Sequence, residues 1–319
     1  MTKRNNWRRR VIAKKELLEK YNISEAGFIA ADISWEALEY IYNDFSSKQG
    51  DYKDKLVNFE KDYLLNIEEA GIHSYRTRIK DPEHLIVKII RKKQENFKKY
   101  KNLNQTNYEK FLTDLIGIRC FILFKEDWRR FHNYIEKRID DNPDKYVKDS
   151  LRDFDEDSGD IYMAEAPKAH IRAGDSIDIY EGILRPDAVK SGKIYRSVHY
   201  IVKYQGVYIE IQVRTLFEEG WGEVDHFMVY PYYQDDKLFQ QYTGLLNRLT
   251  GLADEMSSFF GEVKRLEVGF LKHNRNKEDI AVDKSKKKID VCPKKPVSEN
   301  GNSIVTETPE DCIKCILQE

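Results

Sequence analysis

The segment YRSVHYIVKYQGVYIEIQVRT, residues 195–215, constrains the fold more than any other part of the chain. Apolar and polar side chains alternate along both of its halves, as they do along β-strands. The halves are separated by Gln205-Gly206, and glycine at the second position of a two-residue connection favours the positive φ of a primed turn. The segment therefore predicts a β-hairpin with Tyr204 opposite Val207, and a shift of one residue would mix its two faces.

In that register the two faces of the hairpin differ in chemistry. One face is apolar and is expected to join the core: Val198, Tyr200, Val202, Tyr204, Val207, Ile209, Ile211 and Val213. The other face carries a mixed and largely polar set: Tyr195, Ser197, His199, Ile201 and Lys203 on one strand, and Tyr208, Glu210, Gln212 and Arg214 on the other. A solvated outer face is ordinary in antiparallel sheets, and that interpretation stays open. This set of side chains is nevertheless more typical of a binding site, because solvated faces are usually built from Lys, Glu and Thr.

The order of predicted elements gives the fold class. Helical spacing of apolar residues covers 35–70, with a break at 46–50, and further helices are expected at 81–100, 107–115, 128–139, 216–229 and 237–271. Strands are expected at 73–80 and 118–124 and in pieces over 161–183, besides the hairpin. This order predicts an α/β (α+β) protein with a mixed, partly antiparallel sheet flanked by helices.

The domain organisation follows from the same pattern. We expect a helical N-terminal region at 1–70, a core at 71–235 and a C-terminal helix at 236–275. Residues 276–319 contain few large apolar side chains and are expected to be disordered.

A cationic cluster is predicted where the first strand meets the following helix. Arg78 and Lys80 share one face of the strand, and Lys88 and Arg91 lie on one face of the helix that Asp81-Pro82 opens. Like charges that converge in this way repel unless an anion lies between them, and a triphosphate fits such a group. The alternative, a solvated basic helix face, stays open.

Asp114 stands directly before a buried strand. An aspartate in this position is most often a cap or turn residue. If its strand is a neighbour of the hairpin, however, Asp114 and Glu210 are placed to share a Mg²⁺ ion together with substrate phosphates.

Five motifs in one order resemble the synthetase domain of the RelA/SpoT family of alarmone synthetases. They are R-x-K with a later lysine, D-x-x-G-x-R, YRS-x-H, EIQ-x-RT and W-x-x-x-[DE]-H, and the resemblance covers about residues 50–235. In this chain they are Arg78/Lys80/Lys88, Asp114/Gly117/Arg119, Tyr195-Arg196-Ser197/His199, Glu210-Ile211-Gln212/Arg214-Thr215 and Trp221/Asp225-His226. The resemblance implies a nucleotidyltransferase-like mixed sheet and transfer of pyrophosphate from ATP to the 3′-OH of GDP or GTP, giving (p)ppGpp.

The resemblance also implies roles for individual residues. Catalysis is assigned to Glu210, Asp114 and Lys88, and Mg²⁺ binding to Asp114 and Glu210. ATP binding is assigned to Arg78, Lys80, His84, Lys88, Arg91 and Arg119. Acceptor binding is assigned to Tyr195, Arg196, Ser197, His199, Gln212 and Arg214, with Lys190 or Lys193 as the lysine of the acceptor loop.

Some positions depart from the family pattern, mainly on the acceptor side. The family usually has Ser where His84 stands, Asn-Gly where Lys193-Ile194 stand, and Glu where Asp225 stands. The acceptor is therefore left open between GDP, GTP and the 3′ end of tRNA, which some toxic relatives modify. A catalytically dead nucleotide-binding module is a further alternative, although both carboxylates are present. No His-Asp dipeptide occurs, and the length suggests a synthetase-only protein without the family's hydrolase domain.

Composition limits location and partners. The formal net charge of -1 argues against a protein that binds polyanions over its whole surface. No apolar run is long enough to span a bilayer, and the N-terminus does not resemble a secretory signal, so no membrane partner is expected. Four scattered cysteines favour a reducing, cytoplasmic location. Assembly into a homo-oligomer stays open.

Overall fold

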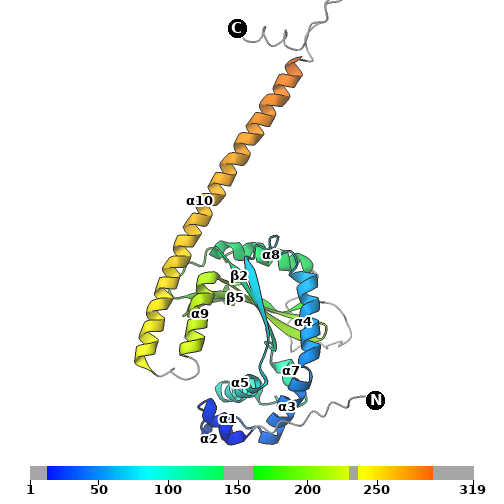
Figure 1. Ribbon diagram of the computed structural model, residues 1–319, viewed down its shortest axis with the longest axis vertical. Coiled ribbons are helices and arrows are strands. Elements are labelled where there is room, and N and C mark those ends of the chain that lie inside the picture. The colour runs from blue at the N-terminus through cyan, green and yellow to red at the C-terminus, as the bar shows by residue number, and fades with distance from the viewer. Residues whose placement is uncertain (1–12, 140–160, 230–235, 290–319) are drawn as a thin grey trace, which may run out of the picture. The chain divides into compact units, whose positions relative to one another are not determined.

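The structure, a computed structural model of the chain, describes residues 13–139, 161–229 and 236–289 (Figure 1). For Lys193 and residues 268–289 it describes the backbone alone. The chain divides into two units, Met1–Val263 and Lys264–Glu319. Everything described below lies in the first unit unless stated otherwise.

Four helices form the N-terminal region: α1 (Lys14–Lys20), α2 (Glu25–Ala30), α3 (Trp35–Ser47) and α4 (Gln49–Tyr63). The side chains of Ser24 and Ser34 accept hydrogen bonds from the backbone amides of Gly27 and Ala37, which fixes where α2 and α3 begin. The expected break near 46–50 is confirmed. α1 begins at Lys14, and residues 1–12 lie outside the described part of the chain.

The core of the unit is a mixed six-stranded sheet with the strand order β1-β2-β6-β5-β3-β4. The pairs β2–β6 and β3–β4 are parallel, and the other neighbours are antiparallel. This arrangement confirms the predicted fold class. The strands are β1 (Ser74–Ile79), β2 (Ile116–Ile122), β3 (Tyr162–Arg172), β4 (Val189–Lys193), β5 (Ser197–Tyr204) and β6 (Val207–Thr215).

The hairpin β5–β6 has the predicted register, with Tyr204 opposite Val207 and Val198 opposite Val213. Gln205 and Gly206 have φ values of 47° and 78°, as a primed two-residue turn requires. The apolar face of the hairpin is buried. Phe59 of α4 packs on Tyr204 with ring centroids 5.4 Å apart, so this face meets the N-terminal helices.

Helices along the rest of the chain border the sheet: α5 (Pro82–Glu95), α6 (Phe97–Tyr100), α7 (Tyr108–Phe111), α8 (Trp128–Arg138) and α9 (Leu216–Met228), with 3₁₀ turns at Lys125–Asp127 and Pro186–Ala188. α8 covers the apolar face, where Phe131 meets Tyr200 at 5.4 Å between ring centroids. The helix expected at 81–100 is divided into α5 and α6, because the Asn96 side chain caps a new helix by accepting from Lys99 N. In place of the helix expected at 107–115, the structure has only the short helix α7, Tyr108–Phe111.

The last helix, α10 (Lys237–Ile289), belongs to the first unit as far as Val263. Its first part lies beside α9, since Trp221 Nε1 donates to the carbonyl oxygen of Thr243 at 3.0 Å (Figure 1). The helix runs to Ile289, whereas the sequence pattern placed its end at 275. Residues 290–319, with the remainder of the expected tail, lie outside the described part. Among the described residues, no helix has both the length and the apolar character needed to cross a bilayer.

Candidate active site

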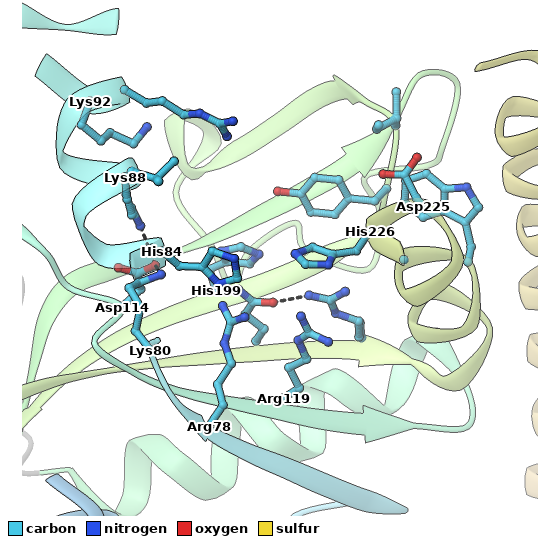
Figure 2. Close-up of a pocket in the computed structure, with 18 of the residues that line it drawn as sticks. Arg78, Lys80, His84, Lys88, Lys92, Asp114, Arg119, His199, Asp225 and His226 are labelled. Atoms are coloured by element: carbon cyan, nitrogen blue, oxygen red, sulfur yellow. Dashed lines mark hydrogen bonds and ion pairs between the residues drawn. The ribbon is translucent and has the colours of Figure 1, made fainter. Parts of the chain in front are cut away.

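A cavity of about 530 Å³ lies on the polar face of the sheet (Figure 2). Side chains from β1, α5, β2, β5, β6 and α9 line it. The sheet register explains why they meet. In one row of paired positions, Arg78 of β1 is followed by Gly117 of β2 and Glu210 of β6. In the next row, Arg119 of β2 is followed by Gln212 of β6 and His199 of β5. Because alternate residues share a face, these positions form two adjacent rows across four strands.

One side of the cavity is strongly cationic. It brings together the predicted basic residues Arg78, Lys80, Lys88, Arg91 and Arg119. Gly117 makes this approach possible, since a Cβ at Gly117 would lie 3.2 Å from Arg78 Nε. The cations of β1 and α5 therefore do converge on one volume, as the sequence predicted.

Asp114 lies at the base of this cationic side. Its Oδ2 atom is 2.7 Å from Lys80 Nζ and 2.5 Å from Lys88 Nζ (Figure 2). Burial alone would raise the pKa of Asp114, but the two ammonium groups outweigh burial and hold it at about 2. Burial lowers the pKa of Lys80, because Asp114 is shared with Lys88 and cannot compensate both ammonium groups fully. The Oδ1 atom of Asp114 is buried and has no hydrogen-bond partner among the described residues.

Glu210 lies on β6, the parallel neighbour of β2, and Asp114 stands two residues before β2, so the condition on the strand order is met. Glu210 is not among the described residues that line the cavity, whereas its partners His199 and Gln212 are. Its Oε1 atom is 3.4 Å from His199 Nδ1, and its Oε2 atom accepts a hydrogen bond from Gln212 Nε2 at 2.9 Å. Burial would raise the pKa of Glu210, yet His199 outweighs burial and lowers it. The charge of Asp114 also acts on Glu210, which places the two carboxylates in one electrostatic environment.

The predicted acceptor residues Tyr195, His199, Gln212 and Arg214 also line the cavity, and Gln212 lies next to Arg119 in the sheet register. The Tyr195 ring stacks on His170, with centroids 5.6 Å apart and an interplanar angle of 27°. Gln212 Oε1 accepts a hydrogen bond from Arg214 Nη2. An aromatic face held in place beside amide and guanidinium donors is suited to a nucleobase.

Four other predicted acceptor residues are not among those that line the cavity. Arg196 is buried, with Nη2 2.8 Å from Asp175 Oδ2 and Nη1 3.2 Å from Asp254 Oδ2. Ser197 is also buried, and its Oγ donates to the carbonyl oxygen of Val213 at 3.3 Å. Lys190 is exposed on β4. The side chain of Lys193 lies outside the described atoms.

His84, which was predicted at the ATP side, lies at the cavity on the first turns of α5. Burial is the main cause that lowers its pKa, so the imidazole is biased toward the neutral form. Figure 2 shows His84, His199 and His226 between the α5 side and the α9 side of the cavity.

The sequence analysis missed the acidic contribution of α9. Glu219 and Glu223 both form ion pairs with Arg119 Nη1, the former at 2.8 Å, and Glu219 Oε2 lies 3.3 Å from Arg214 Nη1. Their i, i+4 spacing directly after a strand was the available signal. These carboxylates hold two arginine side chains in defined positions across the cavity.

Further lining residues come from α5 and α9 and from the residue before Tyr195. Lys92 and Glu95 extend the helix face of Lys88, and their spacing could have identified them. Trp221, expected to pack the helix on the sheet, is buried and also lines the cavity. The other lining residues that the site assignment missed are Val87, Ile194, Gly222, Asp225 and His226.

Residues 77–235 match the family described as a region found in RelA / SpoT proteins. No curated protein matches the chain. Among solved structures, a GTP pyrophosphokinase family protein from Streptococcus pneumoniae is 20% identical, with 73% of this chain and 95% of that chain covered and a TM-score of 0.43. Small alarmone synthetase 1 from Bacillus subtilis is 19% identical, with 72% and 98% covered and a TM-score of 0.43.

The family match runs from the second half of β1 through β6 and α9, and it includes every described residue that lines the cavity. It also contains all five motifs of the sequence analysis. Residues 77–235 of this chain form a domain of the RelA/SpoT family.

Proposed function

We propose that this domain transfers pyrophosphate from ATP to the 3′-hydroxyl of GDP or GTP, giving (p)ppGpp. The observation that carries the proposal is that two carboxylates accompany a cavity that combines clustered cations with an aromatic ring suited to a nucleobase. Asp114, two residues before β2, lines this cavity, and Glu210 on the neighbouring parallel strand β6 contacts its lining residues His199 and Gln212. Two polar binding regions that meet at two carboxylates are what a transfer between two nucleotides requires.

The cationic side supports binding of the donor. Arg78, Lys80, Lys88 and Arg91 would bind the triphosphate of ATP, because guanidinium and ammonium groups match phosphate oxygens in charge and geometry. A bound triphosphate would also relieve the repulsion between these cations. Their convergence would orient the phosphate chain toward the carboxylates, and such positioning accounts for most of catalysis in phosphoryl transfer.

The two carboxylates support the chemistry. Glu210, whose pKa is lowered, is ionised at neutral pH and would accept the proton of the acceptor 3′-hydroxyl. The 3′-oxygen would form a bond to the β-phosphorus of ATP, and the bond from that phosphorus to the bridging α–β oxygen would break. AMP would leave with the electron pair of the broken bond.

The donor set also fits a magnesium ion. The orphaned Oδ1 of Asp114 and the carboxylate of Glu210 would hold Mg²⁺ by hard oxygen ligands, with substrate phosphates completing the coordination. When bound there, Mg²⁺ would neutralise phosphate charge. Among the described residues no cluster of three or more His, Cys, Asp or Glu side chains forms a metal site. Participation of substrate oxygens is therefore part of the proposal.

The decisive experiment is incubation with ATP labelled at the γ-phosphate together with GDP, GTP or bulk tRNA. We expect label on the guanine nucleotide and release of one AMP for each labelled product. Label on tRNA alone would identify the tRNA end as the acceptor and overturn the choice of a nucleotide. ATP binding without label on any acceptor would identify a nucleotide-binding module that does not catalyse transfer.

A further inference from the structure

Helix α10 packs against its own domain with a polar face. The Asp254 side chain is fully buried, and it accepts hydrogen bonds from Thr215 Oγ1 at 2.6 Å and from Arg196 Nη1 at 3.2 Å. Ser257 Oγ donates to the carbonyl oxygen of Leu123 at 2.9 Å. Gly261 lies so close to the sheet side that a Cβ there would be 2.7 Å from the Phe124 ring. The side of α10 that faces the domain is thus built from polar and small residues.

The opposite face of α10 is apolar and exposed. Besides the flanking Phe260, which is 62% exposed, eight large side chains between residues 238 and 263 are 38% to 65% exposed. They alternate at spacings of four and three residues, which is the heptad pattern of a two-stranded coiled coil. We refer to these residues as the α10 seam: Leu238, Tyr242, Leu245, Leu249, Leu252, Met256, Phe259 and Val263.

We propose that the α10 seam binds the α10 seam of a second copy of this chain, forming an antiparallel coiled coil that joins two chains into a dimer. A contiguous apolar stripe of this length is unusual on a monomer and marks an interaction surface. A heptad seam is complementary to another heptad seam, because each side chain inserts between four residues of the facing helix.

Charge complementarity selects the second copy and its direction. In the antiparallel register that overlaps the whole seam, Leu249 packs against Leu252 of the partner subunit, and Leu238 against Val263 of the partner subunit. Glu255 pairs with Lys125 of its own domain at 2.7 Å but is 57% exposed, so its carboxylate is accessible to a second cation. In this register the flanking Arg248 lies beside Glu255 of the partner subunit, and the two-fold symmetry repeats this pair.

The other flank is apolar and also pairs with itself in this register. Leu246 lies beside Ala253 of the partner subunit, and Phe239 beside Phe260 of the partner subunit. A parallel register would instead place Arg248 beside Ala253 of the partner subunit and Glu255 beside Phe260 of the partner subunit, so neither charge would face an opposite charge across the seam. The sequence flanking the seam therefore favours the antiparallel arrangement.

The dimer is independent of the proposed chemistry. None of the described residues that line the cavity belongs to α10. A variant that breaks the dimer can therefore be compared with wild type in two separate measurements, the mass of the assembly and the affinity for nucleotide.

The first test is sedimentation velocity of the full chain at concentrations from about 0.1 to 50 μM. We expect a species of twice the 37.8 kDa chain mass. Leu249→Glu/Leu252→Glu places charges at the centre of the seam, at residues 54% and 62% exposed, and should weaken association about a hundredfold or more. The matched control is Ile29→Glu/Leu65→Glu, at positions 68% and 73% exposed outside α10, which should remain dimeric. A monomeric wild type, or a dimeric seam variant, would overturn the proposal.

The second test determines direction with cysteine pairs, in a background where Cys292, Cys312 and Cys315 are replaced by serine. Leu238→Cys and Val263→Cys lie about 37 Å apart along one helix, so only an antiparallel pair brings them together. We expect a disulfide-linked dimer in an exchanged mixture of the two variants and none in either variant alone. Cross-linking within each single variant, or no cross-link in the mixture, would rule out the antiparallel seam.

Discussion

Two buried carboxylates at the proposed site are kept ionised by different neighbours. Asp114 is stabilised as an anion by two ammonium groups, and Glu210 by an imidazole and an amide. For both groups the lowered pKa extends the ionised form to lower pH than an exposed carboxyl would allow. The site is therefore expected to keep its negative pair throughout the neutral range.

Replacing Glu210 with glutamine tests the chemical role of one carboxylate. The amide keeps the size of the side chain but removes the charge and the proton acceptor, so turnover should fall about 10²- to 10⁴-fold. Binding of a non-hydrolysable ATP analogue, measured by calorimetry, should change little. Glu39→Gln on α3 is the control, because Glu39 interacts with Trp35 outside the cavity. Near wild-type turnover of Glu210→Gln would remove Glu210 from the catalytic assignment.

Replacing Tyr195 tests the nucleobase side. Its ring is held against His170, so a bound guanine would find a fixed aromatic surface, and one stacking contact contributes about 1–3 kcal/mol. Tyr195→Ala should therefore raise the KM for GDP or GTP about ten- to hundredfold, while the Kd for ATP stays close to wild type. Tyr195→Phe keeps the ring and should retain the acceptor affinity. Equal losses in both variants would show that the hydroxyl matters instead of stacking.

At the scale of elements, the hairpin turn sets which side chains face the cavity. Gly206 has φ 78°, a conformation that costs an alanine about 1 kcal/mol. Gly206→Ala should lower the free energy of unfolding by about that amount, as measured by urea denaturation. Gly50→Ala is the matched control, because Gly50 lies in α4 with no atom within 4 Å of an added Cβ, and it should be neutral or stabilising. A destabilisation equal in both variants would contradict the turn argument.

A buried ionic cluster links β3 and β5 with α9 and α10. Glu218 forms an ion pair with Arg172, but neither of its oxygens has a hydrogen-bond partner among the described residues. Burial therefore outweighs Arg172 and raises the pKa of Glu218 to about 7, from 4.5. An acid with a raised pKa binds its proton more tightly in the folded state, so its contribution to stability falls as pH rises from about 4.5 to about 7.

The Glu218→Gln variant should remove this pH dependence. Relative to the variant, the wild-type free energy of unfolding should fall by about 2 kcal/mol between pH 5 and pH 7. Urea titrations of both proteins at the two pH values give this difference directly. A difference that does not change with pH would show that Glu218 titrates normally.

The sequence predicted the elements with strong periodicity and missed those that depend on packing between distant segments. The alternation of β5–β6 fixed the register, and the spacing of Lys88 and Arg91 placed both at the cavity. Arg196 was assigned to the cavity through its motif, yet Asp175 and Asp254 bind it elsewhere. Neither partner is close to Arg196 in sequence, so no local pattern could show this.

Helix α10 turns its polar face toward the domain and its apolar face outward, and this orientation could not be predicted for the same reason. Helical periodicity shows that a helix has an apolar face, but it does not show that this face points away from the domain. The buried hydrogen bonds of Asp254, which reach Thr215 and Arg196, determine the orientation.

At the scale of the whole molecule, the first unit, Met1–Val263, contains the complete cavity and the complete α10 seam. A chain that ends after Val263 should therefore keep both the transfer activity and the dimer. Labelled ATP assays and sedimentation velocity test the two properties independently. A truncation that ends before α10, at residue 229, serves as the contrast, because it removes Asp254 and leaves Arg196 without one of its partners. Loss of transfer in the longer truncation would show that the second unit contributes to the site.

The parallel pairing of β2 with β6 has a consequence for the time at which activity arises during synthesis. β2 ends at Ile122 and β6 begins at Val207, so the ribosome must add the whole intervening segment before the two strands can pair. At usual elongation rates this interval lasts roughly ten seconds. The cations of β1 and α5 emerge early, but Glu210 joins Asp114 only after the hairpin has been made. Under the proposed function, an unfinished chain would therefore hold the basic half of the site without being able to consume ATP.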